Sequence, residues 1–254
     1  MTDLLDLTGK TALVTGASSG LGRHFAQVLA RHGARVAVAA RRTERLEALC
    51  AEIEGPGGRA MPVHLDVQLP DSVERAVAAT ETELGPISVL VNNAGIAASR
   101  PALETSFEEW NQVVSTNLSG AWLVAQATAR HMARLGHGGS IVNIASILGL
   151  AGASQVPAYC AAKAGLVNLT RALAGELARH EIRVNALCPG YVATDLNRDF
   201  LESPAGESLK KRIPQRRFGL PQDLDGILLL LASDASRYMT GAVIAVDGGQ
   251  SAVL

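Results

Sequence analysis

Short runs of β-branched and small apolar residues alternate with longer segments of helical periodicity along almost the whole chain. Several of the short runs are apolar at consecutive positions, as in strands that are buried on both faces of a parallel sheet. This alternation is typical of an α/β fold assembled from βαβ units. It predicts strands at residues 10–15, 34–39, 60–65, 87–91, 140–145, 183–187 and 242–246.

The segments between these runs predict helices that cover the sheet. Pro157 and Pro221 suit the first turn of a helix, where a backbone N–H has no partner to lose. No linker, low-complexity tract or repeat divides the chain. We therefore expect a single Rossmann-type domain over residues 1–254, with a right-handed doubly wound sheet and helices on both faces. The predicted helices span residues 20–31, 43–54, 70–83, 107–135, 157–179 and 221–232.

Residues 189–221 interrupt the alternation. This segment carries proline, glycine and scattered charge without a long regular period. A connection of this length inside a compact domain is usually functional. Because it follows the carboxyl end of a predicted strand, where open α/β sheets bind their ligands, we expect a substrate loop here.

Composition narrows the possible partners and compartments. Lysine and arginine number 23 and the acids 24, a net charge of −1, so neither nucleic acid nor an anionic membrane is an expected partner. The three cysteines form no C-x-x-C pair and the six histidines show no metal-ligand spacing, so we expect no disulfide framework and no metal site. The first ten residues lack the regions of a signal peptide, and the apolar stretch near residue 230 is too short to span a membrane. We expect a cytoplasmic protein.

A glycine-rich turn at residues 15–22 joins the first predicted strand to the first helix. Its three glycines can serve a tight turn, close approach of the backbone to a phosphate, and close packing of helix on strand. The spacing only approximates G-x-G-x-x-G, and a purely structural turn is the alternative. We interpret the turn as a dinucleotide site whose candidate contacts are Gly16, Ser18, Ser19, Gly20, Leu21 and Gly22.

The end of the second predicted strand indicates which dinucleotide is bound. Folds that bind NAD often place an acid there against the ribose 2′-hydroxyl, but this chain has Ala40, Arg41 and Arg42. No carboxylate repels a 2′-phosphate, and two guanidinium groups can pair with one. NADP(H) is therefore the expected cofactor, with NAD(H) possible; two solvated surface arginines are the alternative interpretation.

Further polar or glycine-containing turns follow three other predicted strands. Each could be an ordinary turn, but all lie on the sheet edge along which a dinucleotide extends. They contain Asp66 with Val67, then Asn93, Ala94 and Gly95, and finally Pro189 with Gly190.

Tyr159 and Lys163 are the candidate catalytic residues. Four residues apart on a predicted helix, they share one face. A free tyrosine titrates near pH 10, and stabilising its phenolate to neutral pH takes roughly 4 kcal/mol, which one cation at ~4 Å can supply. The hydroxyl of Ser146, at the end of a predicted strand, can polarise a substrate oxygen beside the phenol. The spacing alone also fits a half-buried tyrosine under a solvated lysine stem.

Taken together, these motifs resemble the short-chain dehydrogenase/reductase family from Gly9 to Gly249. The resemblance implies a seven-stranded parallel sheet in the order 3-2-1-4-5-6-7. It also implies that Tyr159 is the general acid/base, that Ser146 binds the substrate oxygen, and that Lys163 holds the nicotinamide ribose and lowers the tyrosine pKa. Asn117 is then expected to anchor a water molecule in a proton relay. The matching motifs are residues 15–22, Asp66-Val67, Asn92 to Gly95, Asn117, Ser146, Tyr159 to Lys163, Pro189 to Thr194 and Asp247-Gly248-Gly249.

The resemblance also places the cofactor and the substrate. Gly16, Ser19 and Leu21 are expected along the cofactor, and the Arg41 pattern is similar to that of NADP-preferring members. The remaining expected cofactor neighbours are Asp66 and Val67 at adenine, Asn93 at the adenosine ribose, Tyr159 and Lys163, and Val192 and Thr194 at the carboxamide. The residues expected to line the substrate pocket are Ser146, Ile147, Leu148, Val156, Tyr159 and Tyr191.

The sequence thus predicts an NADP(H)-dependent oxidoreductase that interconverts a ketone and a secondary alcohol. One alternative is a 3-oxoacyl-thioester reductase, because Lys210, Lys211, Arg212, Arg216 and Arg217 could meet an acidic carrier or a coenzyme A phosphate. Another is a catalytically silent nucleotide-binding regulatory protein. Helices near residues 110–129 and 161–174 carry apolar or small residues on more than one face, and family members often pair such helices, so we expect a homotetramer.

Overall fold

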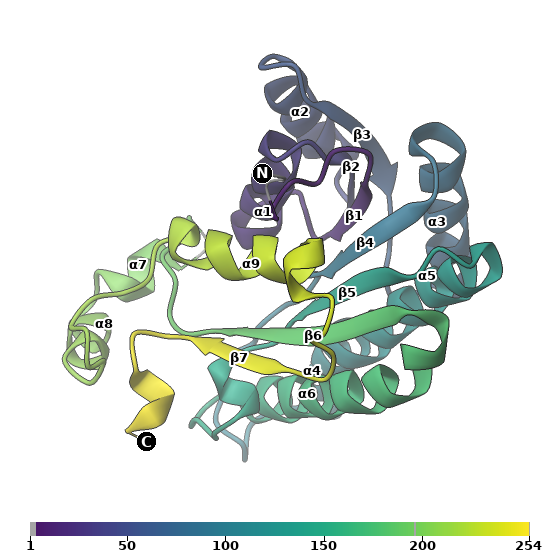
Figure 1. Cartoon of the computed structure of the whole chain (residues 1–254). Coiled ribbons are helices and arrows are strands. Elements are labelled where there is room, and N and C mark those ends of the chain that lie inside the picture. Colours follow the sequence, from purple (N-terminus) through teal and green to yellow (C-terminus); the bar gives the residue numbers. More distant parts are fainter. Residues whose placement is uncertain (1–3, 196, 254) are drawn as a thin grey trace.

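The computed structural model describes residues 4–195 and 197–253. Residues 1–3 of the N-terminal stretch considered above, residue 196 of the predicted substrate loop and residue 254 lie outside the described part. Within that part, seven parallel strands form one sheet in the order β3-β2-β1-β4-β5-β6-β7, which confirms the predicted topology (Figure 1). The strands are β1 (Thr11–Thr15), β2 (Arg35–Ala40), β3 (Arg59–His64), β4 (Ile87–Asn92), β5 (Gly139–Ile144), β6 (Ile182–Pro189) and β7 (Val243–Val246).

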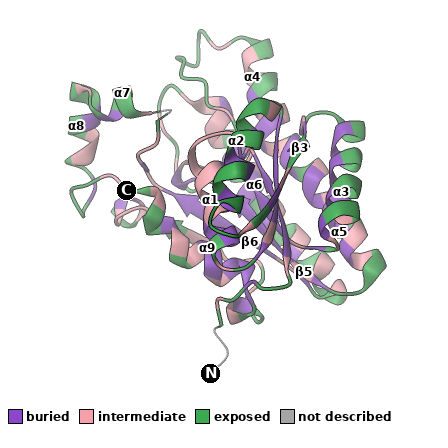
Figure 2. Cartoon of the chain, turned by 90° about the horizontal axis from the view of Figure 1, so that it is seen from above, coloured by how far each residue is buried: buried purple, intermediate pink, exposed green. Residues whose placement is uncertain are grey.

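Helices cover both faces of this sheet, and alternate residues of one strand contribute to the two cores. In β1, Ala12 and Val14 pack into the core that contains Phe25, whereas Leu13 packs into the opposite core with Val77. Figure 2 shows the strands buried at the centre, with exposed residues on the outer sides of the helices. The helices are α1 (Gly20–Arg31), α2 (Thr43–Glu54), α3 (Pro70–Leu84), α4 (Phe107–Val114), α5 (Ala121–Leu135), α6 (Pro157–Leu177), α7 (Arg198–Leu201), α8 (Pro204–Lys210) and α9 (Asp225–Ala232).

Three predicted segments differ from the structure in detail. The helix expected at 107–135 is interrupted by a π-helical segment, η1 (Ser115–Gly120), between α4 and α5. The helix expected at 221–232 begins with a 3₁₀ turn, η4 (Pro221–Leu224), before α9. The predicted substrate loop contains the short helices α7 and α8. The other 3₁₀ turns are η2 (Ile147–Gly149), η3 (Ala178–His180), η5 (Asp234–Ser236) and η6 (Gln250–Ala252).

Strand order reverses between β1 and β4, because β1 lies between β2 and β4 in the sheet. Open α/β sheets bind ligands at the carboxyl ends of the strands beside such a switch point. In the part of the chain that the structure describes, no helix is both long and apolar enough to cross a membrane.

Candidate active site

A cleft of about 1440 Å³ runs along the carboxyl ends of the strands. Most of the residues expected from the sequence to bind cofactor or substrate line it. Two do not: Asn117 and Gly22 are buried beside the cleft and do not line it. The expected residues that line the cleft are Gly16, Ser18, Ser19, Gly20, Leu21, Arg41, Arg42, Asp66, Val67, Asn93, Ala94, Gly95, Ser146, Ile147, Leu148, Val156, Tyr159, Lys163, Pro189, Gly190, Tyr191, Val192 and Thr194.

The glycine-rich turn is fastened to the end of β4. The hydroxyl of Thr15 accepts hydrogen bonds from the backbone N–H groups of Asn93 and Ala94, both at 2.9 Å. Gly16 has a φ of +68°, and a Cβ there would lie 2.9 Å from the Cα of Ala94. Glycine is required at this position both for the backbone conformation and for the close approach.

Gly22 has a packing role in place of the cofactor contact that the motif predicted. A Cβ on Gly22 would lie 2.4 Å from Nδ2 of Asn93 and 2.5 Å from the carbonyl oxygen of Gly16. The first turn of α1 therefore packs directly on the glycine-rich turn. This is the helix-packing role that the sequence left open for one of the three glycines.

The N-terminus of α1 faces the cleft with open backbone donors. Its N-cap, Ser19, makes no side-chain hydrogen bond to the helix within the described chain, and the first turn carries no acid. The first N–H groups of a helix have no intrahelical partner and attract anions. The turn and this terminus therefore fit a pyrophosphate.

Two arginines, Arg41 and Arg42, line the same end of the cleft. Nη2 of Arg42 donates a hydrogen bond to the hydroxyl of Ser18 at 3.1 Å, and the exposed Arg41 lies beside it. Asp66 is the one carboxylate among the described lining residues, and its Oδ1 accepts a hydrogen bond from the backbone N–H of Gln68. A guanidinium beside a serine hydroxyl fits a phosphate ester on a ribose.

Lys163 lies at the other end of the cleft, buried on α6. Its Nζ donates a hydrogen bond to the carbonyl oxygen of Ile144 at 2.7 Å, at the end of β5. The same Nζ lies 5.6 Å from the centroid of the Tyr159 ring. Burial lowers the pKa of Lys163 to about 8.

Tyr159 lies beside Ser146, as the sequence predicted. Burial raises the pKa of the phenol, and the hydrogen bond with Ser146 opposes that rise. The expectation that Lys163 lowers this pKa is not met by the protein's own groups. Burial is the largest effect on this group, so the pKa of Tyr159 lies above its ordinary value and the phenol is protonated at neutral pH.

Ser146 is held by its own turn. Its hydroxyl caps η2 by accepting a hydrogen bond from the backbone N–H of Leu148 at 3.1 Å. The hydroxyl hydrogen remains available to donate into the cleft, since a serine oxygen both donates and accepts.

Asn117 is buried next to the cleft and holds backbone that lines it. It lies in the π-helical segment η1, and its carboxamide makes two hydrogen bonds to the backbone of Ile96, each 2.7 Å long. A Cβ on Gly95 would lie 3.0 Å from Oδ1 of Asn117 and 3.7 Å from Nζ of Lys163. Asn117 therefore fixes the backbone that passes next to the lysine.

Several lining residues were not singled out from the sequence. They come from loops and from the short α7, whose sequences carry no periodic signal, and they meet the site only through the fold. The ring of Phe200, on α7, lies 6.4 Å from that of Tyr191, at an interplanar angle of 34°. The others of chemical interest are Ser99, Ser154, Gln155 and Asn197.

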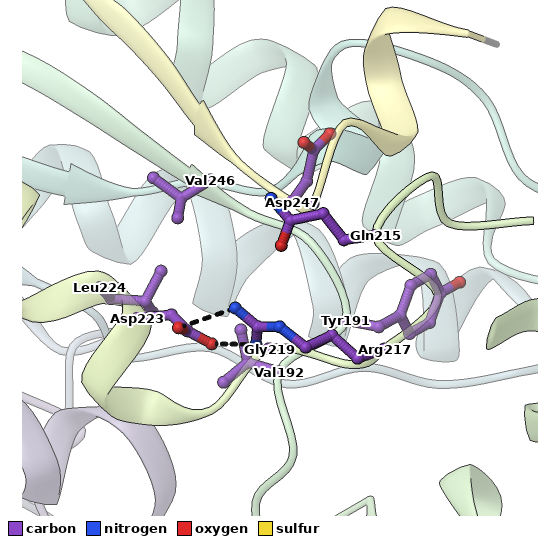
Figure 3. A pocket seen from close by; sticks show the side chains of 10 residues that line it. Tyr191, Val192, Gln215, Arg217, Gly219, Asp223, Leu224, Val246 and Asp247 are labelled. Carbon is purple, nitrogen blue, oxygen red and sulfur yellow. Dashed lines mark hydrogen bonds and ion pairs between the residues drawn. The ribbon is translucent and has the colours of Figure 1, made fainter.

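The base of the substrate loop is closed by backbone and ionic contacts. Val192 and Gly219 form an isolated parallel bridge, so the two ends of the loop meet. Arg217 and Asp223 form a two-pronged ion pair at 2.6 and 3.0 Å beside a cavity of about 240 Å³, where Figure 3 shows the guanidinium facing the carboxylate. This pair holds the pKa of Asp223 down at about 2.

Most of the loop's basic residues already have partners. Arg217 pairs with Asp223, Lys210 with Glu207, and Arg216 donates to the carbonyl oxygen of Lys211. Asp247 accepts hydrogen bonds from the N–H groups of Gly249 and Ser251, so the Asp-Gly-Gly motif forms a C-terminal turn.

Comparisons with known proteins cover nearly the whole chain. The family model described as Enoyl-(Acyl carrier protein) reductase matches residues 16–251. D-threitol dehydrogenase of Mycolicibacterium smegmatis is 41% identical over 243 residues, which cover 96% of this chain and 93% of that protein. The crystal structure of a short-chain type dehydrogenase/reductase from Mycobacterium marinum is 45% identical with a TM-score of 0.93, covering 98% of each chain. Gluconate 5-dehydrogenase from Burkholderia cenocepacia J2315, solved in complex with NADP and tartrate, is 34% identical with a TM-score of 0.95, covering 99% of each chain.

Proposed function

The chain belongs to the short-chain dehydrogenase/reductase family, and from this premise we propose that it is an NADP(H)-dependent oxidoreductase that interconverts a ketone and a secondary alcohol. The observation that carries the proposal is the continuity of one cleft. It joins a phosphate-binding turn and Arg42 at one end to Ser146, Tyr159 and Lys163 at the other. A dinucleotide extended along the cleft would be held by the turn and Arg42 at one end and by Tyr159 and Lys163 at the other.

In this mechanism Tyr159 donates a proton to the carbonyl oxygen during reduction and accepts it back during oxidation. Ser146 donates its hydroxyl hydrogen to the same oxygen and fixes the carbonyl beside the phenol. The cofactor supplies the hydride and, in its oxidised form, a positive charge that stabilises the phenolate. Because burial raises the pKa of Tyr159, the protein by itself keeps the phenol protonated, as an acid for reduction.

Lys163 and Asn117 act around this proton transfer. One N–H of the lysine is used on Ile144, which leaves further donors for the hydroxyls of a nicotinamide ribose. We also propose that Asn117 anchors a water molecule for proton relay. Each polar atom of its carboxamide has capacity left beyond the bond to Ile96.

The choice of NADP(H) rests on Arg42 and Ser18. Their hydrogen bond sets a cation and a hydroxyl side by side, and the cleft offers no carboxylate at the end of β2 among its described lining residues. A 2′-phosphate gains charge-assisted bonds here. The relative from Burkholderia cenocepacia, which was solved with NADP, supports the same choice.

We further propose a homotetramer in the cytoplasm. Phe107 on α4 and Trp122 on α5 are 73% and 39% exposed, which is costly for isolated large apolar side chains. On α6 the small residues Ala161, Ala164 and Ala172 are exposed at helical spacing, which allows close approach of a second helix. Three free cysteines, with no disulfide among the described residues, are compatible with a reducing compartment.

Reduction of 3-oxoacyl thioesters is the second candidate reaction. A 39% identical relative, the 3-oxoacyl-[acyl-carrier-protein] reductase of Thermotoga maritima, favours it. So do Lys211 and Arg212, which are exposed and, within the described chain, have no side-chain ion pair. The paired state of Lys210 and Arg217 weakens it. A catalytically silent regulatory protein is a poorer explanation because Ser146, Tyr159 and Lys163 all line one cleft.

A turnover panel tests the proposed function. Ketones, polyols, sugar acids and 3-oxoacyl thioesters are offered to the enzyme with NADP(H) and with NAD(H), and absorbance of the reduced cofactor is followed. We expect turnover of at least one ketone or secondary alcohol, faster at limiting NADP(H) than at equal NAD(H). Absence of turnover across the panel, with cofactor still bound, contradicts the proposal.

A further inference from the structure

The reacting end of the cleft has a chemical character of its own. We define it by Tyr159 and the lining residues around it, namely Ser99, Ile147, residues 153–156, Lys163, Tyr191 and Phe200. Among the described lining residues at this end, Lys163 is the one ionisable cation, and no carboxylate is present. Lys163 is directed to the carbonyl oxygen of Ile144.

Neutral hydrogen-bonding groups are gathered at this end. The hydroxyl of Ser99 lies 3.5 Å from Oε1 of Gln155, and both residues line the cleft. In the described chain, the amide nitrogen of Gln155 and the hydroxyl of Ser154 have no hydrogen-bond partner. Such groups can donate to and accept from substrate hydroxyls.

Gln155 is fixed in an uncommon backbone conformation. Its φ is +66°, a left-handed value that non-glycine residues adopt at a cost. Its carbonyl oxygen accepts a 2.7 Å hydrogen bond from the N–H of Arg100, which ties the 153–156 turn to the loop that carries Ser99. The two side chains are therefore held on neighbouring loops that face the same cleft.

Two cations, Arg100 and Arg212, lie near this end of the cleft without lining it. Arg100 forms a 2.8 Å ion pair with Glu109. Burial raises the pKa of Tyr191, and Arg212 is close enough to oppose that rise, but Arg212 is exposed and does not line the cleft. Apart from Lys163, a carboxylate at this end therefore meets no cation among the described lining residues, whereas hydroxyl groups meet Ser99, Ser154 and Gln155.

From this pattern we propose that the substrate is a neutral polyhydroxy compound, a polyol or its keto form, in preference to a sugar acid. Gln155 and Ser99, with Ser154, bind the hydroxyl groups next to the reacting carbon. The inference rests on the proposed oxidoreductase function and names the substrate class of that site. It separates two chemistries that are both found among relatives, of which one is a polyol dehydrogenase and another acts on a sugar acid.

The test compares matched substrate pairs on the enzyme with NADP⁺. Four- to six-carbon polyols are each paired with the aldonate of the same configuration, and kcat/KM is measured for both. We expect the best polyol to exceed its aldonate by at least tenfold. An aldonate that is oxidised as fast as its polyol, or faster, overturns the proposal.

A charge substitution makes the test specific for the site. Gln155→Lys places a cation where the structure has a neutral amide, and the polyol-to-aldonate ratio is expected to fall at least tenfold. Gln222→Lys is the matched control, because Gln222 is exposed on η4 and does not line the cleft. An unchanged ratio in Gln155→Lys overturns the role given to Gln155.

A hydroxyl-free cyclic ketone with NADPH separates failure of the inference from failure of the function. If this ketone is reduced while no polyol is oxidised, the substrate class is wrong and the oxidoreductase function stands. If the ketone, the polyols and the aldonates are all inert, the proposed function itself is contradicted.

Discussion

Asn117 holds the backbone of Ile96 through both ends of its side chain. Nδ2 donates to the carbonyl oxygen of Ile96 and Oδ1 accepts from its N–H, each at 2.7 Å. The asparagine is completely buried in the π-helical segment that divides α4 from α5. Insertions of this kind in a helix frequently occur at functional sites, and this one directs a buried amide at the loop beside Lys163.

Replacing this asparagine by alanine tests the contact. Asn117→Ala leaves a part-buried N–H and C=O unpaired, so we expect the free energy of unfolding to fall by about 1 to 3 kcal/mol. Turnover is expected to fall as well, because the Ile96 backbone next to Lys163 loses its support. Urea unfolding and initial rates measure the two effects. Asn111→Ala, at an exposed site on α4, is the control, and equal behaviour of the two variants contradicts this role.

Replacing Gly22 is expected to weaken cofactor binding even though Gly22 does not line the cleft. In Gly22→Ala the new Cβ meets backbone and side-chain atoms at 2.4 to 2.5 Å, so the glycine-rich turn has to shift. We expect a loss of roughly 1 to 3 kcal/mol in stability and weaker NADPH binding, measured by urea unfolding and by fluorescence titration. Gly226→Ala on α9 adds a Cβ with no atom within 4 Å and is expected to be neutral or stabilising. Unchanged stability and affinity in Gly22→Ala contradict the packing role.

Replacing Arg42 is expected to weaken NADPH binding more than NADH binding. Arg42→Ala removes a charge-assisted bond to a 2′-phosphate, worth about 1.5 to 3 kcal/mol, so the Kd for NADPH is expected to rise roughly 10- to 100-fold. The Kd for NADH is expected to change little, since NADH has no 2′-phosphate. Arg45→Ala serves as the control, because Arg45 lies in the first turn of α2, just after Arg42 at the N-cap, but outside the cleft lining. Equal weakening of both cofactors excludes the proposed pairing.

The lowered pKa of Lys163 is expected to make the stability of the protein depend on pH. Burial lowers its pKa from 10.5 to about 8, so between these values the folded chain has released a proton that the unfolded chain still binds. Stability therefore rises with pH across this window, and below it the folded state carries the cost of a buried cation. From pH 7 to pH 9 the expected gain from this group is about 1 kcal/mol.

Unfolding by urea at pH 7 and pH 9 measures this gain. Lys163→Met is expected to lose it, because the titrating group is gone. Lys211→Met removes an exposed lysine of the substrate loop and is expected to keep the wild-type dependence. If the free energy of unfolding rises between pH 7 and pH 9 as much in Lys163→Met as in the wild type, the effect belongs to other groups and the assignment to Lys163 is contradicted.

The sequence predicted the strand order and most of the cleft because both follow from local patterns. Apolar runs defined the strands to within a few residues, and turn motifs at their carboxyl ends, such as Gly16 and Asn93, were placed on one edge by the topology. The π-helical segment around Asn117 was not predicted, since the helical period continues through it. The substrate loop's α7 and α8 are too short to show a period.

The remaining errors concern properties that depend on three-dimensional packing. Gly22 was expected at the cofactor, but the close approach of α1 to Asn93 is visible only in the folded chain. Lys163 was expected to lower the pKa of Tyr159, but the burial of the phenol itself raises that pKa. Gln155 reaches the cleft from an irregular segment and Phe200 from the short α7, and neither segment is long enough in sequence to show a pattern.

Tyr159→Phe tests the central claim most directly, because it removes the phenolic proton and keeps the ring. Single-turnover hydride transfer from NADPH to a ketone substrate is measured together with the Kd for NADPH. General acid/base catalysis contributes typically 10²- to 10⁴-fold, so we predict a rate loss in that range with the Kd unchanged within about twofold. Hydride transfer at the wild-type rate in Tyr159→Phe would contradict the assignment of Tyr159 as the proton donor.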